Sequence, residues 1–98
     1  MSKILDNAKV GYYAKVYGNS EVYDNAEIYD TAQIADSAKV YGNNIVYGNA
    51  KIIDSEIYGN LHICGNAYIF KTTIDNEAGK HHIIICGKAR IHVNLLFL

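Results

Sequence analysis

Aliphatic residues recur at every sixth position through most of this chain of 98 residues. The unbroken part of the series consists of Ile4, Val10, Val16, Val22, Ile28, Ile34, Val40, Val46 and Ile52. The series resumes one residue early at Ile57, Ile63 and Ile69, again one residue early at Ile74, and closes with Ile85, Ile91 and Phe97. An insertion from Asp75 to His82 precedes these last three residues. Because a fixed internal period is typical of repeat architectures, we expect a solenoid.

Each six-residue unit contains the elements of one short strand and one bend. Around Val16 and Val22, outward and inward residues alternate, which predicts strands with one buried face. Two residues before most of the aliphatic positions lies a small residue: Ala8, Ala14, Ser20, Ala26, Ala32, Ala38, Ala50, Ser55, Ala67, Thr72 and Ala89. Pairs such as Gly18-Asn19 and Asp24-Asn25 tolerate left-handed backbone angles and can turn the chain sharply. Three strands and three bends predict a coil of 18 residues, stacked about five times at the sheet spacing.

The repeat resembles that of the hexapeptide-repeat (transferase hexapeptide) superfamily, and the resemblance covers nearly the whole chain. The Gly-Asn-Ala-x-Val phrase carries the likeness, which is strongest to the short members with regular repeats. The resemblance implies an all-β fold, a single-stranded left-handed parallel β-helix, over one domain at residues 1–98. Periodicity alone indicates a three-sided solenoid and does not give its hand. A loop insertion is expected near residues 75–82.

Composition and charge limit the kinds of binding partner that we expect. The formal net charge is −1 and only 19% of residues are charged, which argues against nucleic-acid binding and against an anionic membrane surface. No apolar run approaches the roughly 20 residues of a membrane span. The first residues lack the apolar core of a secretory signal, and two cysteines do not make a disulfide framework. We therefore expect a soluble cytoplasmic protein with free thiols.

The repeat also assigns the outward side chains to three faces. One face carries a column of Lys3, Glu21, Lys39 and Glu56 beside Leu5, Tyr23, Tyr41 and Tyr58, and is expected to be solvated surface. The other two faces become more apolar toward the C-terminal half. A predicted oligomer or partner surface comprises Ile45, Tyr47, Ile53, Tyr68, Phe70 and Ile84 together with the tail residues Leu96, Phe97 and Leu98. The tail is expected to join a second copy end to end, unless the chain is part of a longer product.

These features favour a non-catalytic β-solenoid module for binding or structure, which self-associates as a dimer or trimer through its apolar C-terminal half. The first alternative is an acyltransferase, which the resemblance implies. Such enzymes use a histidine as general base and bind coenzyme A, so His81 or His82 in the insertion would be the catalytic residue. Without that activity, no cofactor is expected.

Two further sets of residues were weighed as sites. His62, Cys64 and Cys86 offer an imidazole and two thiols on neighbouring coils, a possible zinc set, although the expectation is that no metal binds. An acidic strip is formed by Glu21, Asp24, Glu27, Asp30 and Asp36, in a stretch without lysine or arginine. This strip suggests a small inhibitor or regulator of a basic partner protein, of the kind that phages and mobile elements carry, unless lysines of adjacent coils neutralise it.

Overall fold

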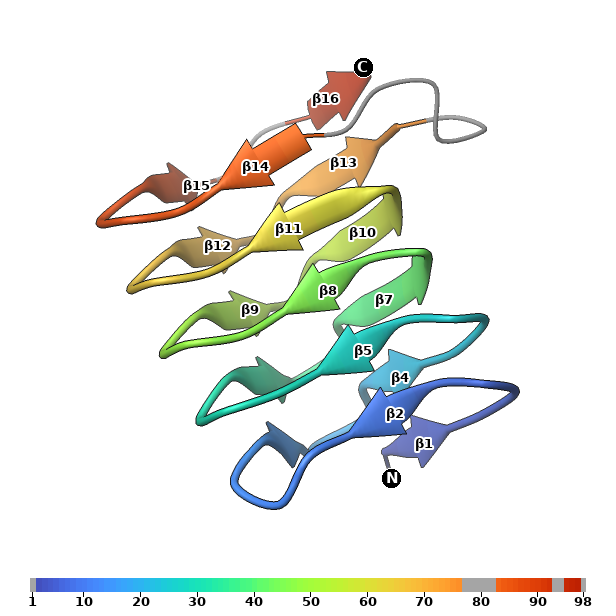
Figure 1. Ribbon diagram of the computed structural model, residues 1–98. Helices are drawn as coiled ribbons and strands as arrows, with labels where there is room; N and C mark the ends of the chain where they lie inside the picture. Colours follow the sequence, from blue (N-terminus) through green and yellow to red (C-terminus); the bar gives the residue numbers. More distant parts are fainter. Residues whose placement is uncertain (1, 77–82, 93–94, 98) are drawn as a thin grey trace.

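The computed structural model describes residues 2–76, 83–92 and 95–97. Within these residues the secondary structure consists of sixteen short β-strands and contains no helix. The strands follow one another around a common axis, and each pairs with the strand one coil away (Figure 1). All the pairings are parallel, and together they build three sheets that enclose one core. The predicted all-β solenoid is therefore confirmed.

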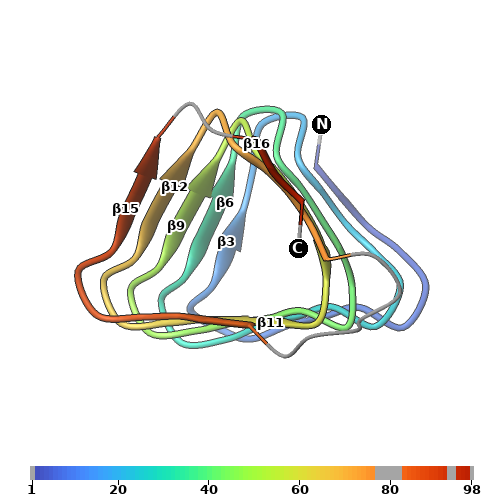
Figure 2. The same cartoon turned by 90° about the horizontal axis from the view of Figure 1, so that it is seen from above.

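We name the three sheets A, B and C. Sheet A contains, in spatial order, β1 (Lys3–Ile4), β4 (Glu21–Val22), β7 (Lys39–Gly42), β10 (Glu56–Gly59), β13 (Thr73–Asp75) and β16 (Leu95–Phe97). Sheet B contains β2 (Lys9–Val10), β5 (Glu27–Ile28), β8 (Ile45–Val46), β11 (Leu61–Ile63) and β14 (Ile83–Ile85). Sheet C contains β3 (Lys15–Val16), β6 (Gln33–Ala35), β9 (Lys51–Ile53), β12 (Tyr68–Phe70) and β15 (Arg90–His92). Seen along the axis, the three sheets form the walls of a three-sided tube (Figure 2).

The register between coils follows the spacing of the repeat. Lys3 pairs with Glu21 and Glu21 with Lys39, which is a step of 18 residues per coil. The step falls to 17 where the sequence lacks one residue, as between Ile45 and His62. It rises to 22 across the insertion, where His62 pairs with Ile84. The predicted deletions and the insertion thus change the length of a coil without interrupting the sheets.

The core is a stack of inward aliphatic side chains, as the six-residue period predicts. The inward residues from Val22 to Ile74 are fully buried: Val22, Ile28, Ile34, Val40, Val46, Ile52, Ile57, Ile63, Ile69 and Ile74. Small residues occupy the inside of the bends and are buried too, for example Ala26 and Ala50. Burial of each large side chain contributes roughly 1.5–3 kcal/mol, so this stack is the main stabilising element.

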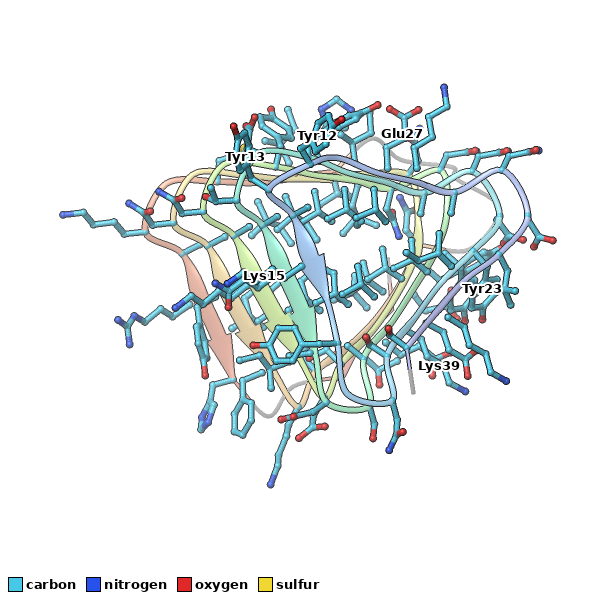
Figure 3. All side chains as sticks on the ribbon, turned by 90° about the horizontal axis from the view of Figure 1, so that it is seen from below. Tyr12, Tyr13, Lys15, Tyr23, Glu27 and Lys39 are labelled. Carbon is cyan, nitrogen blue, oxygen red and sulfur yellow. A yellow bond between two sulfur atoms is a disulfide. The ribbon has the colours of Figure 1, made fainter. Side chains whose placement is uncertain are left out.

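The two ends of the stack differ from its middle. Ile4 in the first coil is 49% exposed, although it continues the inward column, because no coil covers it within the described residues. At the bend of the same coil Tyr12 and Tyr13 are exposed (Figure 3). In β16 the prediction was wrong by one residue, since Leu96 and not Phe97 is in register with Ile74.

Carboxylates and glycines shape the bends. Asp24 and Asp30 have positive φ angles of 59° and 55°, and the carboxylate of each accepts the backbone N–H of the glycine one coil further on. At Gly59, where φ is 133°, a Cβ atom would lie 2.4 Å from the Cβ of Asn76. No other residue fits there without displacing the neighbouring coil. Bend residues therefore serve to stack the coils.

Candidate binding surface

Sheet A presents a regular, charge-balanced outer face. Lysine and glutamate alternate in register along Lys3, Glu21, Lys39 and Glu56. Beside them the ring of Tyr41 stacks on those of Tyr23 and Tyr58, with centroids 4.6 and 4.8 Å apart. The Tyr41 hydroxyl donates to Glu56 Oε2 at 2.5 Å. Partial burial of the hydroxyl is the largest cause of a raised pKa at Tyr41, and this hydrogen bond is the second. The predicted columns are confirmed, and their side chains interact mainly with one another.

The outward face of sheet B loses its charged residues from the first coils to the last. In its first coils Lys9 is in register with Glu27, and the Glu27 carboxylate accepts the hydroxyl of Tyr29. That hydrogen bond is the main cause of a raised pKa at Tyr29. The outward positions of the last three coils, all of them described, carry no lysine, arginine or carboxylate: Ile45, Tyr47, His62, Cys64, Ile84 and Cys86. Ile84 is 65% exposed there.

The two cysteines form a disulfide, which corrects the expectation of free thiols. The register places Cys86 one coil beyond Cys64, as the repeat predicted, and their Cα atoms lie 4.6 Å apart. Neither sulfur is then a thiolate, so the alternative zinc set of His62, Cys64 and Cys86 has no thiolate ligands in this state. The described residues contain no group of three side chains arranged to hold a metal ion. The ring of His62 instead meets that of Tyr47 edge-on, with centroids 6.4 Å apart.

Sheet C combines rings with cations near its C-terminal end. A hollow of about 620 Å³ is lined by Lys51, Tyr68, Phe70, Arg90 and His92. The rings of Phe70 and His92 are stacked, with centroids 5.0 Å apart and an interplanar angle of 14°. Arg90 Cζ lies 6.0 Å from the centroid of the Tyr68 ring, and Lys71 Nζ lies 5.4 Å from that of Phe70. Arg90 and Lys71 are thus each held against an aromatic ring.

The structure divides the predicted apolar surface between two sheets. Ile45, Tyr47 and Ile84 belong to sheet B, whereas Ile53, Tyr68 and Phe70 belong to sheet C. Polar bends such as Gly48-Asn49 and Gly65-Asn66 run between the two groups. The sequence placed all six residues on the correct faces. The repeat spacing also places Lys51 and Arg90 in one column with Tyr68, and the register confirms this placement.

The acidic residues surround the second coil. Glu21 lies on sheet A between Lys3 and Lys39, and Glu27 lies on sheet B beside Lys9. Asp24, Asp30 and Asp36 lie at the three bends of this coil, all with positive φ. Two of these carboxylates accept backbone N–H groups, so they already have partners in the fold. The strip therefore encircles the solenoid and does not gather on one face.

Several predicted site residues lie outside the described part of the chain. These are the loop histidines His81 and His82 and the last residue, Leu98. The backbone of Leu96 and Phe97 belongs to β16, at the C-terminal edge of sheet A. The acyltransferase alternative and its coenzyme A site thus stay predictions.

Asn44 is the internal residue that sequence reasoning missed. It occupies the bend position at which most repeats carry a small residue, and it is fully buried. Its Nδ2 donates to the carbonyls of Tyr41 at 2.7 Å and Ile57 at 3.0 Å, while its Oδ1 accepts the N–H of Leu61 at 2.9 Å. The sequence signal that could have revealed Asn44 is a large polar residue at a repeat position that small residues otherwise occupy.

Among the described residues, no helix has the length and apolar character needed to cross a membrane. Comparison with protein-family models, with curated proteins and with solved structures found no match to this chain.

Proposed function

We propose that this chain is a non-catalytic β-solenoid module that uses its fixed outer faces for binding and self-associates through the C-terminal half of sheet B. The observation that carries the proposal is the exposure of Ile84, 65%, amid outward residues that include no lysine, arginine or carboxylate. Exposed apolar patches of this kind mark contact surfaces. A rigid ladder holds its side chains in place before binding, which lowers the entropic cost of association.

A second copy of the chain suits this surface. A two-fold contact places the same patch against itself, so a charged group near the two-fold axis would meet its own copy and be repelled. Among the described residues, the outward positions of the last three coils, around Ile45, Tyr47 and Ile84, contain no lysine, arginine or carboxylate to create such repulsion. The charged part of sheet B lies in its first two coils, where Lys9 is in register with Glu27, and Glu27 borders the uncharged surface beside Ile45. The C-terminal half can thus pair with itself without burying an unpaired charge.

Sedimentation equilibrium tests the self-association. We expect the wild-type mass at micromolar concentration to be two or three times the chain mass of 10.9 kDa. Ile84→Lys should return the mass to that of the single chain, because the new charge would be buried in the contact. Leu5→Lys is the matched control, since Leu5 is 48% exposed on sheet A, and it should leave the assembly intact. A wild-type mass of one chain would refute the proposal.

We also infer that the solenoid is a left-handed helix of the hexapeptide-repeat type. The steps of 18 and 17 residues per coil and the small residues inside the bends support this inference. A crystal structure would decide it, because a right-handed coil would exclude this type.

A further inference from the structure

Sheet C differs from the other two sheets in its charge. Its strands carry three cationic residues, Lys15, Lys51 and Arg90, and no carboxylate, and all of these strand residues are described. Sheet A alternates lysine with glutamate, and sheet B is mostly uncharged beyond its first coils. The net charge of −1 conceals this difference, because the acidic residues in the described part of the chain lie on sheets A and B and at the bends. One wall of the tube is therefore locally cationic.

The cations follow the axis of the solenoid. Lys15 lies in the first coil, Lys51 in the third and Arg90 in the fifth, within one column of the register. With about 4.8 Å between neighbouring strands, this column extends over about 19 Å. Lys71 adds a further cation beside Phe70. A polyanion laid along the sheet can meet several of these charges at once, which a single small anion cannot.

These cations have no carboxylate partner in the described part of the chain. Arg90 lies over Tyr68 and Lys71 over Phe70, and neither forms an ion pair there. Cation–π contact orients a cation but leaves its charge in place. The aromatic rings therefore position positive charge at the surface of the hollow.

The rings also offer flat surfaces. Phe70 and His92 stack at 5.0 Å and 14° at one side of the hollow, and Tyr68 lies in the neighbouring column. The backbone of this region is already used in the ladder: the N–H of Lys51 donates to Ala67 O and that of Tyr68 to Ala89 O, both at 2.9 Å. Within the described residues β15 is an edge strand of sheet C, so an added peptide strand would pair with that edge and not with the outward face that carries the rings and cations. On that face, the aromatic ring faces and the cationic side chains are the groups available to recognise a ligand.

We propose that sheet C binds single-stranded nucleic acid, with a base stacked against the rings of Phe70 and His92 and phosphates contacted by Lys51, Lys71 and Arg90. Ring faces beside a cationic track are the two features with which proteins hold single strands without reading their sequence. This inference specifies a ligand for the proposed binding module. It does not depend on self-association through sheet B, which lies on another wall of the tube.

Fluorescence anisotropy with a labelled oligothymidylate of about 12 nucleotides tests the inference at low salt. We expect Phe70→Ala to weaken binding about tenfold through lost stacking, and Arg90→Glu to weaken it about tenfold or more. Lys39→Glu and Tyr58→Ala on sheet A are the matched controls, and each should change binding less than about twofold. Far-ultraviolet circular dichroism of each variant verifies that the solenoid is intact.

Two competitors separate the possible sources of binding. Inorganic polyphosphate carries charge without bases, so it should displace the oligonucleotide only weakly from the wild type. If it competes as well as the unlabelled oligonucleotide, or if Phe70→Ala binds normally, the surface is merely electrostatic and the proposal fails. Thymidine monophosphate should compete at least about a hundredfold less well, because it meets only part of the cationic column. Equal competition by the mononucleotide, or no binding of the oligonucleotide, would also overturn it, and neither result bears on the mass measured for the Ile84→Lys variant.

Discussion

Asn44 links three strands from inside the core. Its amide bridges the carbonyls of Tyr41 and Ile57, which belong to neighbouring coils, and its oxygen accepts the N–H of Leu61. A buried amide of this kind is stabilising only because every hydrogen bond it needs is made. Alanine at this position would leave a cavity and remove the side-chain partners of three backbone groups.

We expect Asn44→Ala to lower the free energy of unfolding by about 2–4 kcal/mol, because buried polar groups lose their partners. Urea unfolding followed by circular dichroism measures the effect. Its neighbour Asn43 is exposed and accepts one hydrogen bond from Asn25 Nδ2 at 3.3 Å. Asn43→Ala should therefore cost under about 1 kcal/mol. Equal losses in the two variants would show that Asn44 is not the internal link described above.

The raised pKa of Tyr41 predicts that the fold loses stability at alkaline pH. Burial and the bond to Glu56 raise its pKa above the ordinary value of 10.0, so the folded chain holds the proton after the unfolded chain has released it. Stability from this residue is complete below about pH 10 and falls as the pH rises further. Tyr41→Phe keeps the ring stack but removes the ionisable hydroxyl. We expect its urea midpoint to fall less steeply between about pH 9 and pH 11 than that of the wild type. Parallel slopes would contradict this assignment.

At the scale of elements, the strands have two to four residues and depend on their neighbours in the stack. The last coils are also joined covalently, because Cys64 and Cys86 directly follow β11 and β14. This link closes a loop that contains the whole insertion. Reduction therefore leaves the last coil attached by its ladder and core contacts alone.

Cys86→Ser should lower the free energy of unfolding by about 3 kcal/mol, as the chain-entropy model gives for a sequence separation of 22. Urea unfolding with and without a phosphine reductant measures this difference. Reductant should shift the wild-type midpoint to that of the variant and leave the variant unchanged. A wild-type midpoint that ignores the reductant would contradict a stabilising disulfide. Such bonds persist mainly in oxidising compartments, and the cytoplasmic location stays a prediction.

The period of six was enough to predict the inward positions, because buried residues such as Val40 and Ile57 must repeat wherever strands share one core. It also placed Cys86 beyond Cys64. The pairing of their sulfurs was missed because the expected compartment, and not the geometry, decided the prediction. The period likewise placed His92 one coil beyond Phe70, across the insertion. The stacking of their two rings was missed, because the repeat determines backbone positions and not side-chain rotamers.

At the scale of the whole molecule, the three faces share one core but differ in chemistry. Sheet A is balanced in charge, the C-terminal part of sheet B is mostly uncharged, and sheet C is cationic. The faces can differ because inward residues specify the fold, which leaves the outward positions free to vary. One rigid tube can thus present separate surfaces for self-association and for a ligand. Hydrogen bonds and core contacts run mainly between successive coils, so its stability is expected to vary along the axis.

Hydrogen exchange should reveal this variation. Strands β1, β2 and β3 each have a single neighbour in their sheets, and the inward residue Ile4 is 49% exposed, whereas Val40 and Val46 are fully buried between two coils. Local opening of the first coil therefore breaks fewer contacts than opening of a central coil. Mass spectrometry of peptic peptides should show exchange at least about tenfold faster in residues 2–17 than in residues 38–53. Equal protection of the two segments would mean that the solenoid opens as one cooperative unit, with no dependence on position along its axis.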